Sequence, residues 1–90
     1  MYRLEEIQKI LKKYCVVIAG LGGLGSNVAV SLVRAGIGKL IIIDFDRVEL
    51  SILTRQYYFL DQIGKYKTEA IKETLTRINP EVEIVSYIKR

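Results

Sequence analysis

Four glycines lie within six positions of the segment IAGLGGLGSN, residues 18–27. Gly20, Gly22 and Gly25 have the spacing G-x-G-x-x-G, and Gly23 is an extra glycine between them. Where such a loop joins a strand to a helix, the first glycine forms the tight turn and the second lets phosphate approach the backbone. The third lets the helix pack on the strand, and the helix N-terminus offers N–H groups to an anion. The segment predicts a phosphate-binding loop, and the alternative is a tight turn that binds nothing.

Charged residues follow the next apolar run, KLIIID. Asp44 ends this run, at a distance from the glycines where a carboxylate can accept hydrogen bonds from ribose hydroxyls. Arg55 offers a planar fork of donors that suits phosphate oxygens, and Lys67 would bring a second positive charge. A triphosphate that loses pyrophosphate develops charge that such cations stabilise. The plain alternative is that Arg55 and Lys67 are surface charges. The candidates in this part of the chain are Asp44, Asp46, Arg47, Glu49, Arg55, Gln56 and Lys67.

Hydrophobic periodicity predicts the elements that position these residues. Strands that alternate with helices predict an α/β, Rossmann-like, three-layer fold with a parallel sheet and right-handed crossovers. Residues 1–90 then form a single, partial nucleotide-binding domain of the doubly wound kind. The expected order is a helix in 1–14, a strand in 15–20, a helix in 27–38 closed by Gly36 and Gly38, a strand in 39–44, an irregular segment in 45–64, a helix in 65–79 and a strand in 82–88.

The same patterns give expectations about burial. The apolar run in 15–20 is typical of a buried strand, and we expect Cys15 to be a small core residue. The helix in 27–38 is apolar nearly all round and should be well covered. In a doubly wound sheet the first strand is central, and here the second and third strands fall on one side of it. That leaves the first strand as an apolar edge, so we expect a fragment of a longer protein or a half-domain that dimerises.

Composition narrows the class of protein. Half of the 90 residues are hydrophobic, which is enough for a core, and there is no run of eighteen apolar residues that could span a membrane. The net charge is +4, but the fourteen basic residues are interleaved with ten acidic ones, which does not favour nucleic acid as a partner. The single cysteine forms no internal disulfide, which fits a cytoplasmic protein.

Three blocks together resemble the ThiF/MoeB/HesA family of adenylyltransferases, which are similar to the ubiquitin-activating enzymes. The blocks are GLGGLGSN, then GIGKLIIIDFDRVELSILTRQ, then IGKYKTEAIKETLTRINPEVEI, and they run in the family's order from Cys15 to Ile88. In detail the chain is most similar to ThiF-type enzymes, which activate a small sulfur-carrier protein for thiamine biosynthesis.

The resemblance implies an ATP-dependent enzyme. The family uses Mg-ATP to adenylate the C-terminal carboxylate of a ubiquitin-like carrier protein, and a sulfur nucleophile then attacks the acyl-adenylate. Arg55 and Lys67 would be the catalytic residues, and Asp44 would hold the ribose. The residues implied to bind the nucleotide are Gly20, Gly22, Gly23, Gly25, Asp44, Asp46, Arg55, Gln56 and Lys67.

Three departures from the family's pattern stand out. Ile52 occupies the place of an asparagine in the usual S-N-L-N-R-Q, and isoleucine donates no hydrogen bond to a nucleotide. An N-terminal arginine that some members supply across the dimer has only Arg3 as a remote counterpart. The aspartate that holds magnesium is expected beyond residue 90. We therefore expect the 90-residue chain alone to bind nucleotide without turnover.

Two other functions share part of this pattern. The glycine loop and Asp44 would also suit an NAD- or FAD-binding half-domain of an oxidoreductase, but that reading leaves Arg55 and Gln56 without a role. A non-catalytic fragment that dimerises would suit Ile52 and the incomplete domain.

Overall fold

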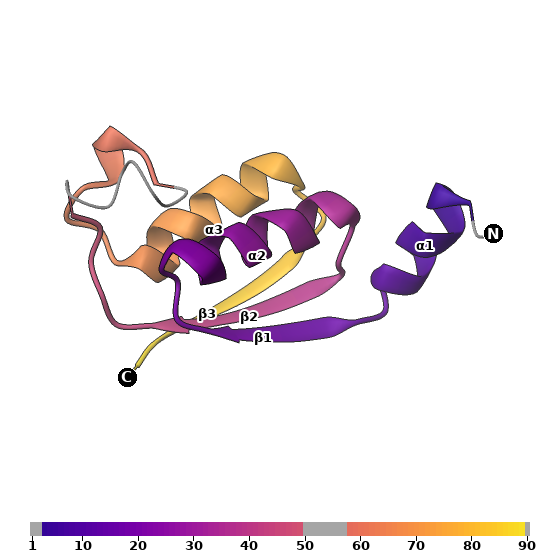
Figure 1. The fold of residues 1–90 in the computed structure, drawn as a ribbon, viewed down its shortest axis with the longest axis horizontal. Coiled ribbons are helices and arrows are strands. Elements are labelled where there is room, and N and C mark those ends of the chain that lie inside the picture. The colour runs from indigo at the N-terminus through magenta and orange to yellow at the C-terminus, as the bar shows by residue number, and fades with distance from the viewer. Residues whose placement is uncertain (1–2, 50–57, 90) are drawn as a thin grey trace.

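The structure is a computed structural model and describes residues 3–49 and 58–89. Three strands alternate with two helices after an N-terminal helix, as the sequence predicts (Figure 1). The elements are α1 (Leu4–Leu11), β1 (Cys15–Ala19), α2 (Gly23–Ala35), β2 (Lys39–Asp44), the short 3-10 helix η2 (Leu60–Gln62), α3 (Lys67–Ile78) and β3 (Glu83–Ile88).

The strands form one parallel sheet in the order β1-β2-β3. Ile18 pairs with Ile42, and Leu40 pairs with Ile84, so these side chains share one face of the sheet. Helices α2 and α3 lie together on that face, while α1 extends away from the end of β1 (Figure 1). The described residues therefore supply two of the layers of the predicted Rossmann-like fold, one sheet and one layer of helices.

The core lies between the sheet and these two helices. Helix α3 contributes Ala70, Ile71 and Leu75, all fully buried, which form its apolar face. Ile78, at the end of the same helix, is half-buried. The other buried apolar residues are Ile18, Leu21, Ala29, Val30, Val33, Ile37, Leu40, Ile42, Val48, Tyr58, Val82 and Ile84.

Helix α2 begins four residues earlier than the apolar pattern predicts, because Gly23 and Gly25 of the glycine loop are already helical. Gly22 is its extended N-cap and Gly23 its first residue. Glycine has low helix propensity, but here the close packing of the first turn on the glycine loop outweighs that preference. The helix ends where expected, at Gly36, whose φ of 101° is left-handed and therefore suits glycine.

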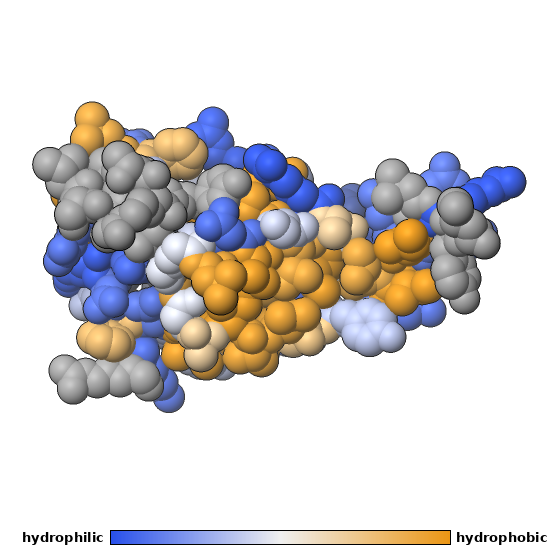
Figure 2. All heavy atoms as spheres, viewed as in Figure 1, coloured by the Kyte–Doolittle hydropathy of each residue, from blue (hydrophilic) through white to orange (hydrophobic). Residues whose placement is uncertain are grey.

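Burial on the β1 side of the molecule differs from the expectation. Cys15 is exposed rather than part of the core, and Val17 is 57% exposed. On α2, Leu24 is 81% and Val28 is 38% exposed, so the helix is not covered all round. Figure 2 shows the resulting hydrophobic patch over β1 and α2. The prediction of an apolar edge is thus confirmed, and the prediction of a buried strand is wrong because nothing in the described residues covers this side.

The irregular segment after β2 folds back on α3. The Gln62 amide nitrogen donates to the Ala70 carbonyl at 2.9 Å, and Lys67 N–H donates to the Asp46 carbonyl at 2.8 Å.

No helix in residues 3–49 or 58–89 has the length and apolar character needed to cross a membrane.

Candidate functional site

The glycine loop connects the carboxyl end of β1 to the N-terminus of α2, as the sequence predicts. Gly20 has a φ of 96°, a left-handed conformation that residues with a Cβ rarely adopt. Its N–H donates to the Ile43 carbonyl at 2.8 Å and so holds the turn against β2. Gly20 therefore forms the tight turn expected of the first glycine in the motif.

The second and third glycines have different surroundings. A Cβ on Gly25 would overlap the carbonyl group of Gly20, so only glycine lets the helix pack this closely on the loop. A Cβ on Gly22 would meet no atom of the described residues within 4 Å. Packing among residues 3–49 and 58–89 therefore does not require glycine at position 22, and this open backbone suits the role expected of the second glycine in the motif.

The N-terminus of α2 has no side-chain cap and no acidic residue in its first turn, a combination that suits an anion. Its N-cap, Gly22, has no side chain to accept a helix N–H. The first backbone bond of the helix runs from Ser26 N–H to the Gly22 carbonyl at 2.9 Å. The backbone N–H groups that precede Ser26 have no partner within the helix and form the positive end of its dipole, where negative charge is stabilised.

Asp44 joins this loop to the end of β2. Its carboxylate is buried, with one oxygen accepting from Leu21 N–H at 2.6 Å and the other from Asp46 N–H at 2.7 Å. A carboxylate has about four acceptor positions, so each oxygen can still accept a hydroxyl. The predicted ribose partner thus lies at the loop, and it also holds the loop's backbone.

Lys67 is the first residue of α3, which begins two residues later than the predicted helix in 65–79. Its side chain is only 9% exposed, and its Nζ lies 4.0 Å from Asp46 Oδ2. That distance is the limit for an ion pair, and Asp46 is itself half-exposed. A largely buried ammonium group with so weak a partner can gain strongly from a second, closer anion.

The contacts bring most of the predicted residues to the carboxyl end of the sheet. Leu21 contacts Asp44, Asp44 contacts Asp46, and Asp46 contacts Lys67. The predicted residues in this series of contacts and in the adjoining loop are Gly20, Gly22, Gly23, Gly25, Asp44, Asp46 and Lys67. Arg55, Gln56 and Ile52 lie outside the described residues.

Arg47 and Glu49, which are sequence candidates in the segment after β2, do not take part in the contacts that connect Leu21 to Lys67. The Arg47 guanidinium donates to the Gly64 carbonyl at 2.7 Å and lies 4.0 Å from the centre of the Tyr66 ring. These contacts close the segment after β2 onto the start of α3, which gives Arg47 a structural role. Glu49 is exposed.

Sequence reasoning did not identify Tyr58. Its hydroxyl donates to the Leu21 carbonyl at 2.8 Å, and the residue is 5% exposed. Burial, and secondarily the nearby Asp44 carboxylate, raise the pKa of the Tyr58 hydroxyl above its ordinary value. An aromatic residue in an irregular segment gives no signal for a bond to a loop 37 positions earlier.

A complete magnesium site is not found within residues 3–49 and 58–89. These residues contain no group of three or more carboxylate, cysteine or histidine side chains that could hold a metal ion. Among the described residues in the series of contacts from Leu21 to Lys67, the carboxylates are those of Asp44 and Asp46 alone. The described residues therefore do not account for a bound magnesium ion.

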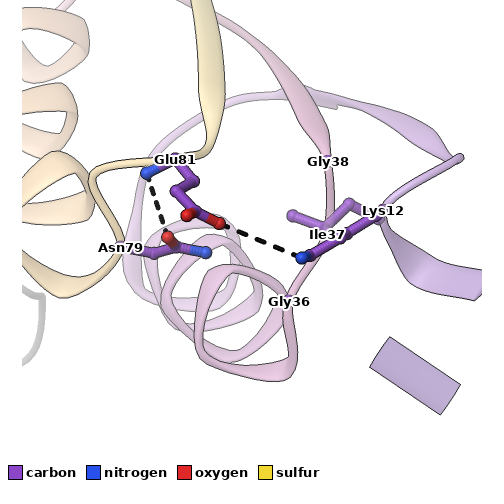
Figure 3. A pocket seen from close by; sticks show the side chains of 6 residues that line it. All are labelled: Lys12, Gly36, Ile37, Gly38, Asn79 and Glu81. Carbon is purple, nitrogen blue, oxygen red and sulfur yellow. Dashed lines mark hydrogen bonds and ion pairs between the residues drawn. The ribbon is translucent and has the colours of Figure 1, made fainter. Parts of the chain in front are cut away.

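A separate hollow of about 220 Å³ lies at the opposite end of the sheet. It is formed where α1 meets the ends of α2 and α3, and an ion pair of 3.9 Å between Lys12 and Glu81 spans it (Figure 3). Both side chains are more than half exposed, so the pair adds little stability. Gly38, which lines this hollow, lies just before the first residue of β2, whereas Asp44 of the glycine-loop site is the last residue of β2. The hollow is therefore distinct from the glycine-loop site.

Comparison with known proteins identifies relatives for almost the whole chain. The ThiF family model matches residues 2–90. Ubiquitin-like modifier-activating enzyme 5 of Oryza sativa is 44% identical over 77 residues, which are 86% of this chain and 18% of that protein. Its counterpart from Dictyostelium discoideum is 46% identical over 77 residues, 86% of this chain and 20% of that protein. The chain thus spans about a fifth of the length of these relatives.

Solved structures agree with the sequence comparison. Escherichia coli MccB with ATP superposes with a TM-score of 0.89 at 44% identity, covering 93% of this chain and 26% of that one. E. coli TcdA, a tRNA N6-threonylcarbamoyladenosine dehydratase in complex with ATP, gives a TM-score of 0.90 at 31% identity, covering 94% and 35%. Because the family model matches almost every residue and the fold agrees, this chain belongs to the ThiF family.

Proposed function

We propose that this protein binds ATP and adenylates the C-terminal carboxylate of a ubiquitin-like protein, with residues 1–90 forming part of one nucleotide-binding domain. The proposal rests on one observation: a series of contacts connects the uncapped N-terminus of α2 to Lys67, which is buried and only weakly paired. The contacts from Leu21 through Asp44 and Asp46 to Lys67 place both at the carboxyl end of one sheet. An anionic nucleotide suits that combination.

In the proposed reaction, a carboxylate oxygen of the carrier attacks the α-phosphorus of ATP. The new O–P bond gives an acyl-adenylate, and the bond from the α-phosphorus to the bridging oxygen breaks, so that pyrophosphate leaves with the electron pair. Charge develops on the leaving group, and Lys67 and Arg55 would stabilise it. Such a reaction needs positioning and charge stabilisation rather than a general base.

The remaining roles follow from the geometry of the loop. Gly20, Gly22 and Gly23 would lie against the phosphates, because the backbone at Gly22 is open and the N-terminus of α2 begins there. Asp44 would use its free acceptor positions for the ribose hydroxyls. We propose that magnesium accompanies the ATP, with protein ligands outside the described residues.

ATP binding by this chain is the first test. Isothermal titration with ATP should give binding, and NADH should give none; binding of NADH in preference would support the dinucleotide alternative. The variant Lys67→Met should weaken ATP binding by about tenfold or more, because it removes the buried charge and keeps the length of the side chain. Lys65→Met is the matched control, since Lys65 pairs with Glu73 in an exposed ion pair and should leave the affinity unchanged. Equal effects of the two substitutions would contradict the role of Lys67.

The carrier can be a ubiquitin-like modifier or a sulfur carrier of the thiamine type. The relatives named ubiquitin-like modifier-activating enzyme 5 support the first, and the blocks quoted from the sequence support the second. ATP–pyrophosphate exchange in the longest available form of the protein, measured with each carrier in turn, separates them. Exchange that depends on neither carrier would argue against carboxylate adenylation.

We further propose that the protein is a cytoplasmic homodimer. The single cysteine supports the location, and the uncovered β1 edge supports self-association. Cell fractionation tests the first of these statements. Light scattering on a sizing column tests the second, and a monomer at high concentration would contradict it.

A further inference from the structure

The peptide units on either side of Leu21 are each held from outside the glycine loop. The Leu21 N–H donates to the Asp44 carboxylate at 2.6 Å, and the Leu21 carbonyl accepts from the Tyr58 hydroxyl at 2.8 Å. The Leu21 side chain is fully buried. Both bonds are long-range in sequence, so they fix the loop to two other parts of the chain.

The bond from Tyr58 also determines where Gly22 N–H points. The Leu21 carbonyl and the Gly22 N–H belong to one planar, trans peptide unit, in which the two groups point in opposite directions. Holding the carbonyl toward Tyr58 therefore turns the Gly22 N–H away from the Tyr58 hydroxyl. No backbone bond from Gly22 N–H is found in the described residues, and Gly22 is the N-cap of α2.

Without the bond from Tyr58, the backbone of the glycine loop would have more conformational freedom than that of most loops. Gly20 and Gly22 flank Leu21, and glycine has the largest range of accessible backbone conformations. A ligand that binds a mobile loop must order it, and this cost lowers affinity. The Tyr58 hydroxyl is a protonated donor throughout the physiological range, since burial disfavours its ionisation.

We propose that Tyr58 is a positioning residue whose hydroxyl holds the Leu21–Gly22 peptide unit and so presets the glycine loop to bind the phosphates of a nucleotide. The nucleotide in this inference rests on the proposed function, whereas the effect of Tyr58 on the conformation of the loop does not depend on it. Phenylalanine would fill the same buried space without donating a hydrogen bond. The hydroxyl itself therefore carries the role.

The test compares Tyr58→Phe with the wild-type chain, and Tyr14→Phe serves as the control because Tyr14 is 58% exposed. Titration with ATP well below the melting temperature should show a loss of affinity of about three- to tenfold for Tyr58→Phe, the size expected for one neutral hydrogen bond. The control should bind as the wild type does. A purely structural role would lower the melting temperature and leave the affinity of the folded chain unchanged, and that result would overturn the proposal.

Amide hydrogen exchange separates this inference from the proposed function. In the absence of ligand, the amides of Leu21 and Ser26, which donate to Asp44 and to the Gly22 carbonyl, should exchange several-fold faster in Tyr58→Phe than in the wild type. The amides of β2 should not change. If the wild type binds no ATP, the proposed function fails. Exchange then decides whether the hydroxyl presets the loop, and equal protection in both chains would overturn the inference with or without a nucleotide.

Discussion

Asp44 illustrates how one carboxylate can organise several backbone segments. Its two oxygens accept from Leu21 N–H and Asp46 N–H, so it connects the end of β2 to the loop before α2 and to the turn after itself. An ionised carboxylate has acceptors only, and both of its neighbours are donors. An amide at this position would bring its NH2 group against one of these N–H groups, which explains why an acid is required here.

Gly25→Ala should destabilise the protein strongly. In an ordinary helix interior this change would add about 1 kcal/mol of stability through helix propensity. Here the new Cβ would overlap the Gly20 carbonyl, which is backbone and has no flexible end to move aside. We expect the overlap to dominate and to lower the free energy of unfolding by about 3 kcal/mol or more. Urea denaturation measures the change, and a stability equal to that of the wild type would contradict the close packing.

Gly22→Ala should have the opposite pattern of effects. A methyl group at Gly22 would meet no atom of the described part of the chain within 4 Å, and the φ of −71° suits alanine. The melting temperature should therefore stay near that of the wild type. ATP affinity should fall by roughly tenfold or more, because the methyl would stand where phosphate approaches the backbone. Retained affinity at unchanged stability would show that the nucleotide does not contact Gly22.

The raised pKa of Tyr58 predicts a loss of stability at alkaline pH. The folded protein keeps this hydroxyl protonated, whereas the unfolded chain releases the proton near the ordinary value of 10.0. The stabilisation is thus complete below pH 10 and declines as the pH rises above it. Urea unfolding at pH 9 and pH 11 should show a larger decline for the wild type than for Tyr58→Phe. Parallel declines would contradict the buried, protonated hydroxyl.

At the scale of elements, α2 is bounded by glycines with different tasks. Gly22 begins it in an extended conformation, and Gly36 ends it with a φ of 101°. The Gly36 N–H donates to the Val33 carbonyl at 3.1 Å, and the next N–H, of Ile37, donates to the Leu32 carbonyl at 3.1 Å. These bonds satisfy carbonyls at the end of the helix, and they need the left-handed turn at Gly36.

Gly36→Ala should therefore lower the free energy of unfolding by about 1 kcal/mol, the cost of placing a Cβ in this conformation. The nearest atom to the new methyl is Gln8 Cγ at 3.5 Å, an ordinary contact, so the cost comes from the backbone alone. Thermal unfolding measures it. Gly22→Ala serves as the control for stability, and equal melting temperatures for the two variants would argue against the strained cap.

The elements were predictable because their signals are local. Gly36 marks the end of α2, Asp44 marks the end of β2, and the Gly20–Gly25 spacing defines the loop between strand and helix. The exposure of Cys15 was not predictable, because a run of apolar residues does not tell whether anything covers it. Tyr58 was missed for a related reason, since its partner is distant in sequence and only the fold brings the two together.

At the scale of the whole molecule, both edges of the three-stranded sheet lack a neighbouring strand among the described residues, and the edge formed by β1 is the apolar one. Strand β1 pairs with β2 alone in the described part of the chain, and its sequence CVVIA contains no charge or proline that would discourage pairing with another chain. The patch over β1 and α2 in Figure 2 continues this edge with Leu24 and Val28. Edge and patch together suit association of two copies.

Val17→Lys should weaken the proposed association of two copies. The residue is 57% exposed in the middle of β1, so a lysine there is tolerated in the monomer but places a charge at the edge. Light scattering across a concentration series should show a dimer for the wild type and a monomer for the variant. Tyr87→Lys, on strand β3 at the other side of the sheet, is the control and should remain dimeric. Monomers in both variants would place the contact on the sheet face instead of the β1 edge.

Cys15 makes the occupancy of this edge directly observable. It is the only cysteine in the sequence, it begins β1, and it is exposed. A thiol-reactive dye would therefore attach at one known place without any engineered residue. The rate of attachment would report how often the edge is open, and the emission of the attached dye would report when another surface covers it. The protein thus contains its own reporter for whatever completes its sheet.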